Sequence, residues 1–192
     1  MKKEIRIVGF DDAPFIPRSR GKTTVIGVVT RGGEFADGIM KTEVTIDGLD
    51  ATDKLIRIVN KSKHKPQLRV IMLNGITIAG FNMVNIYKLS KRTKLPVIVV
   101  NRKRPNLTKM RKALMNFDDF EKRWVIVEAA GEIRKVEVRG GKFIYYQKSG
   151  IGGSEAEEII KMSCTHSLLP EPLRLAHLIA SALVKGESGG RP

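Results

Sequence analysis

The stretch Val70–Lys103, VIMLNGITIAGFNMVNIYKLSKRTKLPVIVVNRK, decides the fold. It begins inside one apolar run, Leu68–Leu73, and ends just after a second, Leu95–Val100; both have the length and the β-branched residues of buried strands. The intervening Phe81–Thr93 is expected to be a helix. Nearly continuous apolar strands joined through a helix are typical of right-handed crossovers, so the stretch predicts two neighbouring parallel strands.

Upstream of this unit, three shorter patterns predict strands with no helix between them. They cover Ile5–Phe10, Thr23–Thr30 and Gly38–Ile46. Their short connections favour an antiparallel meander. The following segment, Ala51–Ser62, changes to helical spacing. A meander followed by parallel crossovers predicts an α/β protein whose mixed sheet carries helices on both faces.

Downstream, the chain continues as a mixture of helices and strands. We expect helices over Asn106–Asn116, Glu155–Met162 and Leu173–Leu183, and strands over Trp124–Ala129 and Glu132–Tyr146, the latter with a hairpin turn at Gly140-Gly141. No internal repeat or linker divides the chain. Residues 1–185 are therefore predicted to form a single domain, and residues 186–192 a flexible tail.

The chain is strongly basic. Its 192 residues include 35 Lys and Arg against 20 Asp and Glu, which gives a net charge of +15. Such an excess favours nucleic acid or an acidic membrane over a merely solvated surface. No stretch approaches the ~20 apolar residues of a membrane span, so we expect nucleic acid and not a membrane. Cys164 is the only cysteine, which excludes an intramolecular disulfide and favours a reducing, cytoplasmic setting.

Polar residues follow three of the predicted strands. Asp11-Asp12 follows the first strand, Asn74 the fourth, and Asn101-Arg102-Lys103 the fifth. The carboxyl ends of strands in open α/β sheets are the usual place for a site. A buried carboxylate is costly unless it is paired or bound to a cation, although Asp also begins ordinary turns. The pattern leaves both interpretations open.

Carboxylate and amide oxygens suit Mg²⁺, which is held by one or two carboxylates together with water and substrate phosphates. A metal in such a site polarises a phosphate and orients the attacking water. Lys103 is placed to hold a phosphate as a point charge. The alternative is that Lys103 belongs to an ordinary solvated basic run, NRKR.

The stretch quoted first resembles the central strand–helix–strand of endonuclease V, a family with the ribonuclease H-like fold. In that family a strand ending in Asp-Gly precedes a helix, a Leu-x-Val-Pro-like strand and a lysine. The opening Ile7–Asp12, IVGFDD, resembles the family's first strand, and Leu169–Ala180, LPEPLRLAHLIA, its last helix. The resemblance implies that Asp11 is a metal ligand and that His177 can join the metal site.

A second resemblance covers most of the chain. The stretches Gly9–Phe15, Thr45–Thr52 and Gly75–Asn82 are similar, in the same order, to those of a family of uncharacterised, mainly archaeal homologues of endonuclease V. This similarity implies a ribonuclease H-like mixed sheet.

The chain departs from endonuclease V at two positions of the implied metal site. Asn74 stands where that family has Asp, and an amide oxygen brings no negative charge, so metal affinity should be lower. Endonuclease V also has a glutamate after its third strand. Here Asp50 is the preferred match, ahead of Asp47 and Asp53.

A third departure concerns base recognition. Endonuclease V probes a distorted base with a Pro-Tyr-Ile-Pro wedge near its third strand, and this chain has none there. Pro14–Pro17, PFIP, is similar but follows the first strand; it is either a wedge or a stiff loop that packs one Phe. Recognition of a deaminated base is therefore not implied by the resemblance.

Together, charge and resemblance predict an endonuclease V-like protein that hydrolyses phosphodiester bonds of DNA or RNA with Mg²⁺ or Mn²⁺ at a weakened site. The alternative is an inactive protein that has lost the metal and binds nucleic acid or joins a complex on the same scaffold. The expected metal ligands are Asp11, Asp50, Asn74 and His177. These four residues and Lys103 are the expected catalytic residues. The expected nucleic-acid contacts are Arg18, Arg20, Arg102, Lys103 and Arg104.

Overall fold

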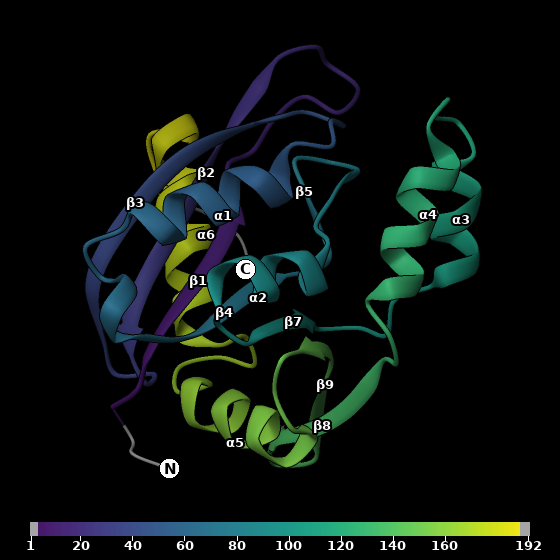
Figure 1. The fold of residues 1–192 in the computed structure, drawn as a ribbon. Coiled ribbons are helices and arrows are strands. Elements are labelled where there is room, and N and C mark those ends of the chain that lie inside the picture. The colour runs from purple at the N-terminus through teal and green to yellow at the C-terminus, as the bar shows by residue number, and fades with distance from the viewer. Residues whose placement is uncertain (1–3, 189–192) are drawn as a thin grey trace.

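A computed structural model describes residues 4–188 of the chain, and residues 189–192 of the predicted tail lie outside them. A seven-stranded sheet with the order β3-β2-β1-β4-β7-β9-β8 organises the molecule (Figure 1). Its strands are β1 (Arg6–Asp12), β2 (Lys22–Arg31), β3 (Phe35–Thr45), β4 (Leu68–Asn74), β7 (Val97–Asn101), β8 (Arg134–Arg139) and β9 (Lys142–Ser149). The helices are α1 (Ala51–Lys61), η1 (Lys65–Gln67, 3₁₀), α2 (Ile86–Thr93), α3 (Leu107–Leu114), α4 (Phe120–Ala129), α5 (Gly153–Ser163) and α6 (Glu171–Lys185).

The predicted mixed sheet is confirmed, and its centre is parallel. β1, β2 and β3 form the antiparallel meander. β4 lies parallel to β1, and β7 lies parallel to β4. β9 and β8 then extend the sheet in antiparallel fashion. As a result β1, β4 and β7 all end at one edge of the sheet, which is where Asp11, Asn74 and Asn101 stand.

The helix predicted from Phe81 begins later, at Ile86. A small hairpin, β5 (Thr77–Ile78) and β6 (Asn82–Met83), occupies the intervening residues. The side chain of Asn85 accepts a hydrogen bond from the backbone N–H of Lys88 at 2.8 Å, and this cap fixes the first turn of α2. Apolar spacing alone does not locate such a boundary.

The strand predicted over Trp124–Ala129 is wrong, because these residues belong to α4. Arg123 in the first turn of α4 forms an ion pair with Asp119, four residues earlier. Its guanidinium also donates hydrogen bonds to the carbonyl oxygens of Gly48, at 3.1 Å, and Phe81, at 2.7 Å. A buried arginine bound to two distant loops is a tertiary interaction, and it overrides the β-branched character of the following residues.

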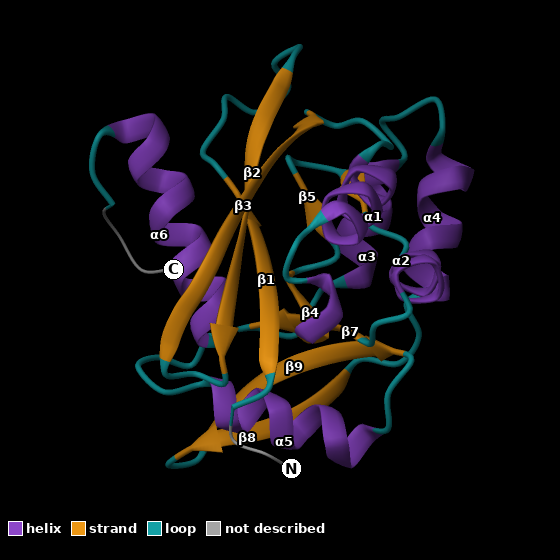
Figure 2. Cartoon of the chain, turned by 60° about the vertical axis from the view of Figure 1, so that its left-hand side comes forward, coloured by secondary structure: helices purple, strands orange, loops and turns teal. Residues whose placement is uncertain are grey.

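Helices cover both faces of the sheet, as Figure 2 shows. Consecutive residues of β1 point to opposite faces. Val8 and Phe10 face α1 and α2 in the larger core cluster, whereas Ile7 packs with residues of α5 and α6. None of the helices between residues 4 and 188 combines the length and apolar character that a membrane crossing needs.

The last helix, α6, lies directly on the backbone of β1. A Cβ atom added at Gly9 would stand 2.6 Å from the carbonyl carbon of Pro172 and 2.7 Å from the backbone nitrogen of Leu173. Both partners are backbone atoms, so no side-chain rotation relieves the clash. Glycine at position 9 therefore sets the distance between α6 and the sheet.

We predict that Gly9→Ala lowers the free energy of unfolding by about 1–3 kcal/mol or more, because the added methyl group displaces α6. Gly152→Ala is the matched control: a Cβ there meets nothing within 4 Å, and the φ of Gly152 is −68°. The control should change stability by less than about 1 kcal/mol. Urea denaturation of both variants measures the difference, and equal effects would contradict the role given to Gly9.

Candidate functional site

Asp11 and His177 form the centre of the candidate site. Asp11 is 7% exposed at the end of β1, and His177 lies on the second turn of α6. The Nδ1 atom of His177 lies 2.9 Å from the Oδ2 atom of Asp11. This hydrogen bond, with the negative charge of Asp11, raises the pKa of His177 above its ordinary value. The contact joins the first strand to the last helix.

Asn74, at the end of β4, faces the same carboxylate. Its Nδ2 atom lies 3.5 Å from both oxygens of Asp11, which is longer than a well-formed hydrogen bond. An Asp at position 74 would bring a second negative charge against Asp11, and the repulsion between two facing carboxylates is relieved either by a shared proton or by a bound cation. Asn74 therefore presents a polar side chain to Asp11 without adding a second negative charge.

Asp12 places a second carboxyl group at this edge, which the sequence prediction had not chosen. Its pKa is raised to about 6, first because the group is buried and second because Asp11 is negatively charged. A backbone hydrogen bond from Ala79 opposes the shift. Neighbouring residues of a strand point to opposite faces, so Asp11 meets α6 and Asp12 meets the β5–β6 hairpin.

Asp50 does not join this group, although it was predicted to be a ligand. Its Oδ1 accepts hydrogen bonds from the backbone N–H of Thr45 at 3.0 Å and from Nδ2 of Asn82 at 2.7 Å. Burial would raise the pKa of Asp50, but these hydrogen bonds lower it. Asp50 closes the turn before α1. Within residues 4–188, no three His, Cys, Asp or Glu side chains converge on a possible metal position.

The predicted basic contacts lie on two loops at this edge. Arg102, Lys103 and Arg104 are exposed after β7. Arg18 and Arg20, also exposed, are on the loop after β1. Arg18 and Arg20 line a pocket of about 960 Å³. The other walls of this pocket come from the loop after β3, the β5–β6 hairpin and the end of α3.

This pocket, which the sequence did not predict, has aromatic walls. Phe15, Phe81 and Phe117 line it. The rings of Phe81 and Phe117 meet edge to face, with centroids 5.6 Å apart. Phe15 and Pro17 belong to the PFIP segment, so that segment forms part of a pocket wall. Only the fold brings three phenylalanines from separate loops together.

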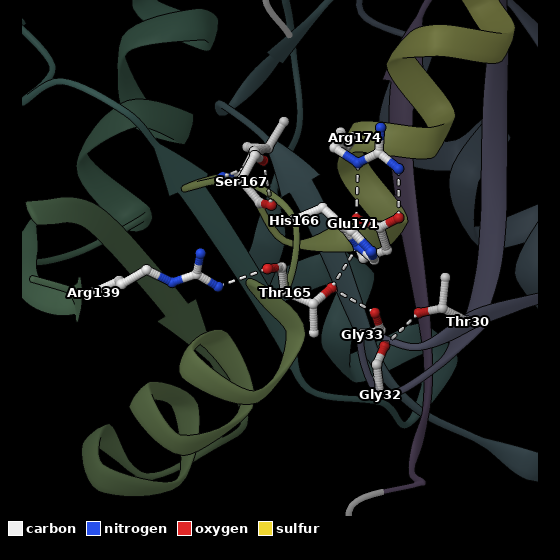
Figure 3. Close-up of polar contacts among 10 residues, drawn as sticks. Thr30, Gly32, Gly33, Arg139, Thr165, His166, Ser167, Glu171 and Arg174 are labelled. Atoms are coloured by element: carbon white, nitrogen blue, oxygen red, sulfur yellow. Dashed lines mark hydrogen bonds and ion pairs between the residues drawn. The ribbon is translucent and has the colours of Figure 1, made fainter.

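A separate polar cluster fixes the start of α6 (Figure 3). Glu171, 3% exposed, accepts hydrogen bonds from Arg174 at 2.6 and 2.8 Å, and His166 lies 3.3 Å from it. Thr165 donates a hydrogen bond to the carbonyl oxygen of Gly33 at 2.6 Å, which ties the α5–α6 loop to the β2–β3 turn. These contacts hold the helix that carries His177.

The profile of the protein family described as Endonuclease dU matches residues 3–184. The chain belongs to this family. A UPF0215 protein of Methanothermobacter thermautotrophicus is 51% identical over 191 residues, covering 99% of this chain and 93% of that protein. A UPF0215 protein of Pyrococcus horikoshii is 48% identical over 190 residues, covering 98% and 96%. The predicted membership of an archaeal-type family related to endonuclease V is confirmed.

Solved structures show the same fold. A protein of unknown function from Archaeoglobus fulgidus superposes with a TM-score of 0.85 at 45% identity, covering 94% of this chain and 99% of that one. Endonuclease V of Bacillus subtilis superposes with a TM-score of 0.63 at 13% identity, covering 95% and 81%. Endonuclease V of Ciona intestinalis, in complex with DNA containing an inosine, superposes with a TM-score of 0.62 at 14% identity, covering 97% of this chain and 88% of that one. The ribonuclease H-like fold is thereby confirmed.

We predict that Glu171→Gln destabilises the protein in a pH-dependent way. Burial would raise the pKa of Glu171, but hydrogen bonds and charge from Arg174 lower it below 4.5. A depressed folded-state pKa contributes stability that is present above the unfolded pKa and is lost as pH falls through the folded one.

The loss in Glu171→Gln should therefore be about 1–3 kcal/mol at pH 6–7 and shrink below about pH 4. Glu158→Gln, on the exposed side of α5, is the control and should have little effect at any pH. Urea denaturation at a series of pH values gives the comparison. A Glu171→Gln deficit that stayed constant down to pH 3 would rule out the charged contact as its cause.

Proposed function

We propose that the protein is a metal-dependent endonuclease that cleaves DNA at a deaminated base such as uracil. The observation that carries the proposal is the group Asp11, Asn74 and His177 at the carboxyl edge of the parallel strands. Membership of the Endonuclease dU family and the fold shared with endonuclease V support it. The basic character of the chain, +15, suits a polyanionic substrate.

The donor set suits a weakly held Mg²⁺ or Mn²⁺. Mg²⁺ keeps several waters and is typically bound through one or two carboxylates and substrate phosphates, so three converging acids are not needed. Asp11 offers carboxylate oxygens, and rotation of the Asn74 amide presents its oxygen in place of its nitrogen. When bound, the metal would act as a Lewis acid on the scissile phosphate.

The chain's own residues position the reacting groups. His177 holds the Asp11 carboxylate through Nδ1 and so acts as a positioning residue for a ligand. Lys103, exposed beyond β7, is proposed to hold a substrate phosphate. Neither role requires Asp50, whose oxygens are engaged by Thr45 and Asn82.

The 960 Å³ pocket is the proposed position for the altered base. A base turned out of a duplex is commonly stacked between aromatic and apolar side chains and read along its hydrogen-bonding edge. Phe81 and Phe117 supply aromatic surface, and Asn116 supplies an amide in the same pocket. Arg18 and Arg20, which also line the pocket, are proposed to contact the flanking phosphates.

The second candidate function is nucleic-acid binding without cleavage, alone or within a larger complex. Asn74 favours it, since one of the metal's charged ligands is missing relative to endonuclease V. The absence, among residues 4–188, of any three His, Cys, Asp or Glu side chains that converge on a possible metal position favours it as well. The two candidates predict the same DNA affinity and differ only in cleavage.

We predict that the protein cleaves a uracil-containing duplex in Mn²⁺ or Mg²⁺, and that Asp11→Asn slows cleavage by about a hundredfold or more, because a charged ligand is lost. Asp11→Asn should bind the same duplex in EDTA with nearly wild-type affinity. A thymine-containing duplex is the substrate control. Wild-type binding with no cleavage of uracil- or inosine-containing DNA or RNA would establish the second candidate instead.

We predict that Asn74→Asp makes stability depend on metal. The new carboxylate would face Asp11, so the melting temperature in EDTA should fall by several degrees, and Mn²⁺ should restore it. Cleavage should rise. Asn101→Asp, at the end of β7, is the charge-matched control. It should show neither a melting temperature that Mn²⁺ restores nor an increase in cleavage. Loss of stability that Mn²⁺ does not restore would count against a metal position between residues 11 and 74.

A further inference from the structure

A second groove, between β3 and α1, carries a concentration of positive charge. It has a volume of about 350 Å³, and four of the eight residues that line it are cationic, with no acid among them: Lys41, Lys54, Arg57 and Lys61. None of these residues lines the 960 Å³ pocket. The groove is therefore separate from the proposed cleavage site.

The cations of α1 lie along one stripe of the helix. Lys54, Arg57 and Lys61 are spaced three and four residues apart, so their side chains project from the same side. The only acid of α1, Asp53, is paired with Lys88 of α2 at 2.7 Å and does not neutralise the stripe. No ion pair within residues 4–188 involves any of the three stripe cations. Like charges on one stripe repel unless an anion lies against them.

β3, which forms the other side of the groove, has an unpaired edge. It is one of the two edge strands of the sheet and pairs only with β2, so its outer backbone groups are not used by the sheet. An exposed edge can accept a strand of another chain. A second copy would, however, bring the same cationic stripe against itself. Charge complementarity therefore selects an anionic occupant.

The dimensions suit a nucleic-acid backbone. The seven residue steps from Lys54 to Lys61 advance about 10 Å along α1 at about 1.5 Å per residue. One strand of a DNA duplex carries one phosphate per about 3.4 Å of helix axis, so a stripe lying along that axis faces about three phosphates. The carboxyl end of β3 also leads into the 960 Å³ pocket, through Thr45 and Ile46. DNA seated at that pocket can continue along α1.

We propose that the β3–α1 groove binds about three phosphates of DNA outside the cleavage edge and so anchors the substrate. The proposal rests on the DNA-binding part of the proposed function but needs neither the metal nor cleavage. Its contribution is electrostatic and independent of sequence, so undamaged duplex serves as the probe.

The test compares wild type with the triple variant Lys54→Gln, Arg57→Gln, Lys61→Gln. The control, Arg69→Gln, Lys142→Gln, Lys161→Gln, removes two lysines and one arginine from exposed positions outside both the groove and the pocket. Fluorescence anisotropy with an undamaged 24-base-pair duplex, in EDTA, gives Kd between 50 and 200 mM KCl. Thermal melting confirms that both variants are folded.

We expect the groove variant to weaken binding by about tenfold or more at 50 mM KCl. The slope of log affinity against log salt concentration should be smaller in magnitude by about two to three, since each phosphate contact contributes about 0.9 to that slope. The control should change both quantities much less. Equal losses in both variants, an unchanged slope, or a change in oligomeric state on size-exclusion chromatography without loss of DNA binding would overturn the proposal. Absence of cleavage by wild type would leave the groove standing and would refute only the nuclease.

Discussion

The contact between Asp11 and His177 depends on how closely α6 approaches β1. Gly9, two residues before Asp11, allows the backbone of Pro172 and Leu173 to lie against the strand. The cluster around Glu171 then fixes the first turn of α6, one and a half turns before His177. Asp11 and His177 are 166 residues apart along the chain, so their contact depends on the tertiary fold and not on local structure.

The electrostatics at the sheet edge are compatible with an uncharged Asn at position 74. Asp11 and Asp12 already place two acids at the end of one strand, and the pKa of Asp12 is raised to about 6 by burial and by Asp11. A third acid facing Asp11 would add repulsion that a shared proton or a bound cation relieves. Asn74 adds no charge to the edge, whereas the proposed function predicts that an Asp would make its stability depend on metal. His177, through its hydrogen bond, offsets part of the remaining negative charge.

Most of the fold follows from local patterns, and most of the site does not. Strand periodicity, the apolar runs of β4 and β7 and the hairpin glycines predicted the sheet because each is a short-range property. The helix α4 was missed because Arg123 stabilises it through distant carbonyls. The hydrogen bond between Asp50 and Asn82 was not predicted, because nothing in the sequence neighbourhood of Asp50 reveals the amide of Asn82. His177 was identified only through the resemblance to endonuclease V, and the aromatic pocket only through the structure.

The proposed function requires that Asp11, supported by His177 and facing Asn74, holds the catalytic metal. Anomalous diffraction from crystals soaked in Mn²⁺ tests it most directly. We predict one Mn²⁺ peak at the Asp11 carboxylate, with the amide oxygen of Asn74 turned toward it. A peak at Asp50 or Asp47, with the Asp11–His177 contact unchanged and no density for metal at Asp11, would contradict the account.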